Sequence, residues 1–510
     1  MKPITRRSFL QSAAGTTIAV AMAPTLSSCR SVTTQAKKTG YFESEFGITY
    51  SLCRKVLDEA LSKGGDYADL YFEHTIDNRV VLEDGKVNQA YCDVILGVGT
   101  RTVKGDQVGY GFTQELTAKS MMGAASTAAT IANSSPNVSA GEFVRLQFKN
   151  HYPLEKLLTS VPFESKLQVV QSTNDKCFAL SPMIIKVNAG FRDQQKRVMV
   201  VTSDGVKSED LLPLNYLFAS VIAEKQGRRE TAWWDLGGRK DFSYYSQEVA
   251  EDVARTVVGR VIVLFDAVQP PAGEMPVVLG PGITGTLLHE AIGHGMEADY
   301  NRKGISTYST MIGEKVAEPF VTIIDDGTNP GLAGSLNVDD EGTPGQKTVL
   351  VENGILRSYM HDKISAKHYQ VKSTGNGRRQ SYEHYVIPRM RNTYMLAGPA
   401  TPEEVIKSAR NGIYVQDVGG GEVSPGEGDF AFYVAQGRMI EDGKLTAPVK
   451  DVNIVGNGPK MLKNVTMVAN DLEMWQGASG GCGKDGQGVF VGVGLPTTLV
   501  QSMTVGGIKT

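Results

Sequence analysis

The apolar pattern after residue 46 predicts one helix followed by antiparallel strands. In TYSLCRKVLDEALSK (49–63), apolar side chains recur every three or four residues, so they lie on one face of a helix. Runs of β-branched and aromatic residues follow, and turn signals such as Asp84-Gly85 divide them into hairpins. A second helix is predicted over 117–133. These elements predict an α+β N-terminal domain over 47–135.

The next 130 residues predict a middle domain, 136–265. Two strand-like runs, IIKVNAGF and KRVMVVTSDG, precede one helical stretch, SYYSQEVAEDVARTVVGRVIVLF. Charged residues on that helix are typical of a solvated face. The Pro270-Pro271 pair then marks a domain boundary.

The remaining residues, 266–510, predict a large β-rich domain. Short apolar runs alternate with hairpin turns at Asn353-Gly354 and Asp442-Gly443. One helix is marked by Thr401 as N-cap and Glu404 as its capping-box partner. The whole chain is therefore predicted to be α+β, with a β-rich C-terminal domain.

The amino terminus has the pattern of an export signal. Arg6 and Arg7 precede a mildly apolar stretch, which resembles a twin-arginine signal over 1–29. The sequence LSSC, ending at Cys29, resembles a lipobox whose cysteine becomes acylated; the alternatives are a chance cysteine and a basic tail. Residues 30–46 are polar and aperiodic, as expected of a tether. We expect a periplasmic or membrane-attached lipoprotein that meets the membrane only through this lipid.

Composition narrows the function. The chain has 510 residues, of which 41% are apolar and 21% charged, so most of it should fold. Its 52 basic and 55 acidic side chains give a formal net charge of -3, which disfavours a nucleic-acid partner. Cys53, Cys92 and Cys177 are scattered, and such cysteines are more often buried small side chains than disulfides.

The strongest chemical signal is HEAIGH, in which Glu290 follows His289, and His294 lies five residues after His289. In the HExxH motif of zinc peptidases, positions i and i+4 lie about 40° apart on an α-helix, whereas i and i+5 lie about 140° apart. A regular helix therefore cannot direct both imidazoles at one ion. A π-bulge at 291–294 would restore the geometry, and Gly293 would give the backbone freedom for it. The alternative is two unrelated histidines.

A catalytic zinc site usually has three protein ligands and one open position. Cys482 is one candidate for the third ligand, because it lies in a glycine-rich loop that can approach a metal closely. The residue types alone leave the choice open among Glu297, Asp299, His361, His368, His384 and Cys482.

A family resemblance emerges at this point. The segment HEAIGHGMEADYNRKG resembles the metal-binding segment of the catalytic TldD branch of the TldD/PmbA family. The resemblance covers roughly residues 47–510. Further similar segments follow in the same order, namely DDEGTPGQ, STGNGRRQSY, PRMRNTYMLAG, VGGGEV and CGKDGQ.

The resemblance implies a zinc peptidase. Its metal would be bound by His289, His294 and Cys482, with Glu290 as general base. It also implies a dimer, either a homodimer or a heterodimer with a PmbA-like subunit, that admits unfolded peptides. Zinc would activate a water molecule for attack on a peptide carbonyl.

Four further residues fall in the similar segments. Arg378, Arg379, Arg389 and Tyr394 are candidates for binding a substrate carboxylate or an oxyanion, and equally for structural ion pairs. A competing function is a lipid-tethered peptide-binding or chaperone-like subunit with a structural metal. A DNA-topology role, historically attached to the family, is disfavoured by the net charge.

Overall fold

The computed structural model describes residues 40–424 and 427–507. The predicted signal, Cys29 and the first part of the predicted tether lie outside these ranges. The tether prediction is wrong at its end, because Tyr41–Phe46 form helix α2 and Phe42 is buried. A six-residue helix is too short to show an apolar period.

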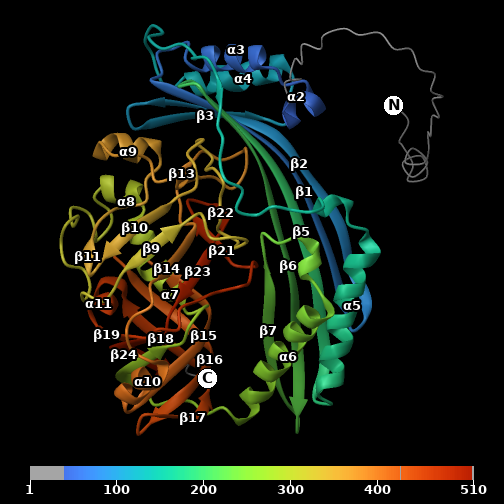
Figure 1. Cartoon of the computed structure of the whole chain (residues 1–510), viewed down its shortest axis with the longest axis vertical. Coiled ribbons are helices and arrows are strands. Elements are labelled where there is room, and N and C mark those ends of the chain that lie inside the picture. Colours follow the sequence, from blue (N-terminus) through green and yellow to red (C-terminus); the bar gives the residue numbers. More distant parts are fainter. Residues whose placement is uncertain (1–39, 425–426, 508–510) are drawn as a thin grey trace, which may run out of the picture. The chain divides into compact units, whose positions relative to one another are not determined.

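The N-terminal half is built on one seven-stranded sheet, with strand order β3-β2-β1-β5-β6-β4 and with β7 also paired to β6 (Figure 1). Its strands are β1 (Tyr67–Glu83), β2 (Lys86–Lys104), β3 (Gln107–Thr113), β4 (Val144–Arg145), β5 (Ile184–Thr202), β6 (Val206–Lys225) and β7 (Arg228–Gly238).

This sheet joins the two domains predicted over 47–135 and 136–265. Strand β1 pairs with β5 antiparallel along nearly its whole length. The two strand-like runs predicted near residue 190 are a single strand, because the polar residues between them also lie in the ladder. Arg192 of β5, for example, forms an ion pair with Asp77 of β1 at 2.5 Å. Apolar pattern alone reveals neither strand partners nor such polar pairs.

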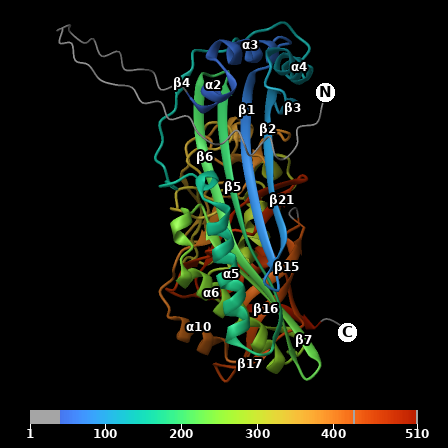
Figure 2. The same cartoon turned by 90° about the vertical axis from the view of Figure 1, so that its right-hand side faces the viewer.

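Four helices cover the sheet. Near β3 lie α3 (Tyr50–Ala60) and α4 (Ala118–Ala129), as predicted. Figure 2 shows α5 (Phe163–Leu180) and α6 (Gln247–Val263) running along one face. The sequence pattern did not predict α5, whose buried face includes Lys166, Thr173 and Asn174 among its apolar side chains.

The C-terminal half contains two larger sheets and two short hairpins. The first sheet has the order β11-β10-β9-β14-β23-β20, and its strands are β9 (Ile323–Asp326), β10 (Lys347–Glu352), β11 (Ile355–Leu356), β14 (Asn392–Met395), β20 (Glu473–Met474) and β23 (Gly492–Leu495). The second has the order β15-β8-β24-β18-β16-β17 with β19 beside β24, and its strands are β8 (Gly273–Leu279), β15 (Gly412–Val423), β16 (Asp429–Glu441), β17 (Lys444–Val449), β18 (Val452–Asn457), β19 (Val465–Val468) and β24 (Thr498–Gly507).

Short elements complete this half and include those that carry the candidate site. The paired short strands are β12 (Gly377–Arg378) with β13 (Ile387–Pro388), and β21 (Gly481–Lys484) with β22 (Gln487–Phe490). The helices are α7 (Gly285–Leu288), α8 (Ala298–Arg302), α9 (Lys363–Tyr369), α10 (Pro402–Ala409) and α11 (Gly458–Lys463). The predicted capping box of Thr401 and Glu404 is present at α10. The predicted α+β fold with a β-rich C-terminal region is confirmed.

Buried charges connect the two halves. Arg101 of β2 forms ion pairs with Asp69 of β1 at 2.5 Å and with Glu341 at 2.6 Å, and all three side chains are fully buried. Removing one partner from such a buried pair is strongly destabilising. Within residues 40–424 and 427–507, none of the helices has the length and apolar character needed to cross a membrane.

Candidate metal centre

His289 and His294 lie at the two ends of a π-helical turn. Helix α7 runs into a π-helical segment at His289–Gly293, and a tighter turn follows at His294–Met296. The His294 amide donates a hydrogen bond to the His289 carbonyl oxygen, so the hydrogen bond spans five residues. The predicted π-bulge is confirmed, although it begins two residues earlier than expected.

The widened turn brings the donor atoms together. The two imidazole rings have centroids 5.2 Å apart and planes at 84°. The Cys482 Sγ atom lies 3.3 Å from Nε2 of His294. One donor atom of each of the three residues lies within 4.8 Å of the others, and all three side chains are buried. Metal–ligand distances of about 2.0–2.3 Å place ligand atoms at such separations around one ion.

Glu290 faces this cluster but remains accessible. Its Oε2 atom lies 3.5 Å from Nε2 of His294, and 25% of its side chain is exposed, against 3% for His294. The carboxylate is thus the most accessible group at the cluster. It can exchange protons with water.

A buried ion-pair network holds His294 from behind. Nδ1 of His294 lies 2.9 Å from Glu297 Oε2, which leaves Nε2 directed at Cys482. Lys484 binds the same Glu297 oxygen at 3.0 Å and Asp299 at 2.7 Å. The attraction of Lys484 and His294 overcomes the effect of burial and lowers the pKa of Glu297 to about 2. Glu297 and Asp299, two of the candidate ligands, therefore orient a ligand. Lys484 was not predicted as a site residue.

Cys482 lies on a hairpin and not in the glycine-rich loop that the sequence predicted. Strands β21 and β22 pair in register, with Cys482 opposite Val489, and Asp485 forms the turn at a φ of 50°. Its Asp485-Gly486 pair is a hairpin signal that was available in the sequence. Arg389 fixes the hairpin by donating to the Cys482 carbonyl oxygen and, at 3.2 Å, to the Gln487 carbonyl oxygen.

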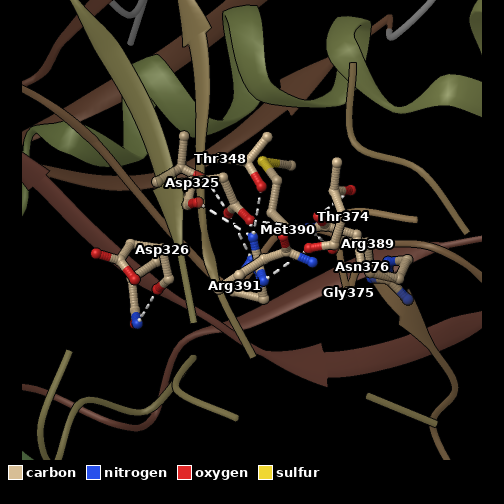
Figure 3. A network of polar contacts seen from close by, with 12 residues as sticks. Asp325, Asp326, Thr348, Thr374, Gly375, Asn376, Arg389, Met390 and Arg391 are labelled. Atoms are coloured by element: carbon tan, nitrogen blue, oxygen red, sulfur yellow. Dashed lines mark hydrogen bonds and ion pairs between the residues drawn. The ribbon is translucent and has the colours of Figure 1, made fainter. Parts of the chain in front are cut away.

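Arg389 is itself fixed by a second buried network (Figure 3). Arg391 Nε donates to Asp325 Oδ1 at 2.7 Å, and both side chains are fully buried. Asn376 donates to the same Asp325 oxygen at 2.8 Å and to the Arg389 carbonyl oxygen at 2.9 Å. The segment 389–391 is therefore held rigidly beside the hairpin of Cys482.

Gly293 is required for space and not for backbone freedom, which corrects the prediction. Its φ of -59° and ψ of -50° are ordinary helical values that any residue adopts. A Cβ atom added at Gly293 would lie 2.1 Å from Sδ of Met390. The glycine lets the segment with Met390 pack directly against the π-helical turn.

The charges of the cluster reinforce one another. Burial opposes ionisation of Cys482, but the neighbouring His289 and His294 imidazoles lower the pKa of its thiol well below the ordinary value. Burial likewise opposes the charge of His294, yet Glu297 and Cys482 raise its pKa well above the ordinary value. Such a cluster favours a thiolate, the form in which cysteine binds metals.

The other candidate histidines lie elsewhere. His361 packs between Tyr359 and Tyr369, and burial lowers its pKa to about 4. His384 Nδ1 lies 3.1 Å from the Ser381 hydroxyl oxygen, and His368 stacks edge-on with Tyr369. The group of potential metal-binding side chains found among the described residues is His289, His294 and Cys482.

The candidate substrate residues already have partners within the chain. Tyr394 donates to Asp326 at 3.3 Å, and Arg379 forms an ion pair with Asp69 at 3.1 Å. Arg378 and Arg379 also line the large cavity described below, whereas Arg389 and Tyr394 do not. None of the four belongs to the group of potential ligands, although Arg389 contacts the backbone of Cys482.

The residues present fit a metal ion. Both ring nitrogens of His289 are buried, and neither has a partner in hydrogen-bond geometry. A buried polar atom without a partner costs about 1–3 kcal/mol, which coordination of one nitrogen would offset. Two imidazoles and a thiolate are the donors that borderline-soft divalent metals prefer.

Comparison with known proteins finds three successive family models that match most of the described chain. Residues 68–132, 156–265 and 272–507 match, in turn, PmbA/TldA metallopeptidase domain 1, the central domain and the C-terminal domain. A Haemophilus influenzae protein named metalloprotease TldD homolog is 39% identical over 449 residues, which cover 87% of this chain and 93% of that protein.

Two crystal structures share the fold at low sequence identity. A Thermotoga maritima protein described as a candidate modulator of a DNA gyrase has a TM-score of 0.73 and 20% identity, covering 90% of this chain and 100% of its own. TldE from Thermococcus kodakarensis has a TM-score of 0.71 and 18% identity, and the match covers 89% of this chain and 100% of the TldE chain. These likenesses show the fold alone.

Proposed function

The chain belongs to the PmbA/TldD metallopeptidase family and to its TldD branch, and from this premise we propose that it is a zinc-dependent peptidase that hydrolyses unfolded peptides. The observation that carries the proposal is the convergence of His289, His294 and Cys482 within 4.8 Å around a π-helical turn. These three residues would hold the zinc ion.

Zinc bound at this position supplies Lewis acidity, which polarises a peptide carbonyl and acidifies water. Glu290 is the general base in the proposal, because it is the carboxylate at the cluster that water can reach. It accepts a proton from the attacking water and then delivers that proton to the leaving amine. Glu297 keeps Nδ1 of His294 occupied, so the same imidazole nitrogen always faces the metal position.

The test is the Glu290→Gln protein. Its zinc content should equal that of the wild type, because Glu290 is not a ligand in the proposal. Its hydrolysis of an unstructured peptide carrying a fluorophore and a quencher should fall roughly 100- to 10,000-fold, the usual contribution of a general base. Glu318→Gln, which changes an exposed glutamate in the same half of the chain, is the matched control.

The outcomes separate the two functions considered for this chain. Retained hydrolysis in Glu290→Gln excludes this residue as the base. A wild-type protein that holds zinc and binds the peptide without cleaving it supports the peptide-binding or chaperone-like subunit instead.

We also propose that the protein is dimeric, either with itself or with a PmbA-like subunit. One observation supports this. The outer edge of β2 before Val98 has no pairing strand among the described residues, and several of its apolar side chains are exposed. Unpaired strand edges are natural places for a second chain to associate. Light scattering of the purified protein, alone and with a PmbA-like partner, tests the assembly.

Export by the twin-arginine route and lipidation of Cys29 remain proposals that rest on the sequence of 1–29. Fractionation of cells that express the wild type, an Arg6→Lys/Arg7→Lys variant or Cys29→Ser tests both. The twin-lysine variant should stay inside the cell, and Cys29→Ser should lose its membrane attachment.

A further inference from the structure

A cavity of about 880 Å³ lies between the N-terminal sheet and the hairpin that carries Cys482. This volume is within the usual range for ligand pockets. The proposed metal ligands do not line it, but Gly481 and Val489 do. Gly481 precedes Cys482 in the chain, and Val489 pairs with Cys482 across the hairpin. The cavity therefore adjoins the metal cluster.

Two buried arginines line this cavity without a carboxylate partner. Arg239 is 6% exposed and Arg378 is 5% exposed. Among the described residues, no carboxylate oxygen lies within 4.0 Å of either guanidinium group. Arg239 donates to the Pro213 carbonyl oxygen at 3.0 Å, and its buried Nε has no partner. Arg378 donates to the carbonyl oxygens of Met390 and Phe490.

Other buried arginines of this fold are neutralised within the chain. Arg101 has Asp69 and Glu341, and Arg391 has Asp325. Leaving a charge buried without a counter-charge is costly, so chains rarely do so without a reason.

The pKa of Arg378 also reflects an excess of positive charge in the cavity. Burial, together with the nearby charges of Arg389 and Arg239, lowers the pKa of Arg378 to about 10. Asp340 attracts both Arg239 and Arg378, but one of its oxygens already accepts the Arg379 amide at 2.8 Å. Asp210 also attracts Arg239, and Asp325 also attracts Arg378. Both of these carboxylates already accept hydrogen bonds from other side chains, so neither guanidinium group has an ion-pair partner of its own.

The other acidic side chains that line the cavity are Glu73, Asp77 and Glu383, and none of them forms an ion pair with Arg239 or Arg378. Glu383 is exposed and accepts a hydrogen bond from the Tyr382 hydroxyl at 3.1 Å. Glu73 is paired with Lys196 at 3.3 Å, and Asp77 is paired with Arg192. The wall nearby is apolar at Leu214. A single negative charge attached to an apolar or uncharged chain is the ligand that this environment suits.

We propose that the cavity binds the C-terminal carboxylate of the peptide substrate between the guanidinium groups of Arg239 and Arg378. The inference rests on the proposed peptidase function and names its substrate class, peptides with a free C-terminus. Guanidinium groups form short, charge-assisted hydrogen bonds with a carboxylate and hold it in a defined orientation.

The position of Arg378 fixes the distance between the bound C-terminal carboxylate and the proposed metal ligands. Its Nη2 atom donates to the Phe490 carbonyl oxygen at 2.8 Å, and Phe490 pairs with Gly481, the neighbour of Cys482. The carboxylate would therefore sit at a fixed distance from the metal ligands. Cleavage should release a C-terminal fragment of constant length whatever the peptide sequence.

The experiment compares three peptides: a free acid, the same peptide as a C-terminal amide, and the amide with an added internal aspartate. Binding is measured by fluorescence anisotropy to the zinc-loaded Glu290→Gln protein, and cleavage by wild type is followed by mass spectrometry. The acid should bind at least about tenfold more tightly than the amide, equivalent to 1.4 kcal/mol. Its C-terminal fragment should keep one length across several sequences.

Variants assign the effect to the two arginines. Each of Arg239→Gln and Arg378→Gln, made in the Glu290→Gln background, should bind the acid no more tightly than the amide while keeping its zinc content. Arg239→Lys, which retains the charge, should keep part of the preference and so distinguishes lost recognition from lost folding. Arg79→Gln is the matched control, because Arg79 also has a buried, unpartnered Nε but lines a different cavity.

The possible outcomes distinguish a failure of this inference from a failure of the proposed peptidase function. Equal binding and equal fragments for acid and amide overturn the inference but leave the peptidase intact. Affinity regained by the internal aspartate overturns the terminal assignment, because the cavity then takes side-chain carboxylates. Absence of cleavage of any peptide by wild type overturns the proposed function itself.

Discussion

The histidine half of the metal cluster, residues 289–294, and the cysteine half, residues 481–490, meet at one point but are held there by different means. The histidines are placed by the backbone, because a π-helical turn rotates two side chains five residues apart onto one side. The cysteine is placed by long side chains, since Arg389 from another segment holds its carbonyl and Lys484 of its own strand binds Glu297. A local sequence can encode the first arrangement, whereas the second needs the finished fold.

Removal of one proposed ligand from each half should have the largest effect on zinc binding. Both His294→Ala and Cys482→Ser should weaken zinc binding by more than the roughly 100-fold upper limit typical of outer-sphere changes. Metal analysis and competition with a chelator measure this. Cys177→Ser, which changes another buried thiol far from the cluster, should keep its zinc. Full zinc occupancy in Cys482→Ser would show that the cysteine half is not part of the site.

The next largest effect should come from Lys484→Met, which disconnects the two halves and leaves all three proposed ligands intact. Glu297 and Asp299 then lose their buried cation, and removal of one partner from a buried pair costs about 3–5 kcal/mol. Zinc affinity should fall about 10- to 100-fold, as for other groups that orient a ligand. Chemical denaturation measures the loss of stability, and zinc titration measures the loss of affinity. The control is Lys315→Met, which removes one partner of an exposed ion pair. Unchanged zinc affinity would mean that the halves are independent.

The stability of the protein should depend on pH through the hydrogen bonds that join the segment before the cysteine half to the N-terminal sheet. Asp235 of β7 accepts hydrogen bonds from the Ala478 amide at 2.8 Å and the Ser479 amide at 3.0 Å, just before the hairpin. Burial raises the pKa of Asp235 to about 6, although these amides act in the opposite direction. The folded protein therefore binds this proton more tightly than the unfolded chain does.

The contribution of Asp235 to the free energy of unfolding is largest below about pH 4, falls as the pH rises to about 6, and is constant above that. Asp235→Asn should remove this part of the pH dependence, up to about 3 kcal/mol at roughly 1.4 kcal/mol for each unit of pKa shift. Denaturant titrations of both proteins between pH 4 and 7 provide the comparison. If the free energy of unfolding changes with pH in the same way in both proteins, Asp235 is not the group responsible.

The smallest expected effect is a change in stability caused by a substitution in the histidine half. Gly293→Ala should destabilise the protein by about 1–3 kcal/mol, because the new methyl group meets Sδ of Met390. Gly123→Ala in α4 has open space at the same atom and should instead stabilise the helix by about 0.5–1 kcal/mol. Thermal unfolding measures both. If Gly293→Ala is neutral, the close packing of the π-helical turn is not needed.

The same contrast explains what the sequence alone could predict. The five-residue spacing of His289 and His294 required a widened turn, and the structure contains one. The reason assigned to Gly293 was wrong, because a contact with Met390, almost a hundred residues later, decides the need for glycine. Residue type left six candidates for the third ligand, and only the family resemblance pointed to Cys482.

The fold shows the same division. Local signals predicted the start of α10 and the turn at Asp84-Gly85, where both residues have positive φ. They did not predict that β1 pairs with β5. Nor did they predict α5, whose buried polar residues blur its apolar face. Pairing partners across more than a hundred residues leave no trace in an apolar period.

The separation of 188 residues between His294 and Cys482 also sets an order of events during synthesis. At about 5–20 residues per second, roughly 10–40 s pass between translation of the histidines and of the cysteine. A nascent chain, or one truncated before the hairpin, carries only two of the three proposed ligands. In the proposed site, a chain whose synthesis has not yet reached the hairpin therefore lacks a complete set of metal ligands.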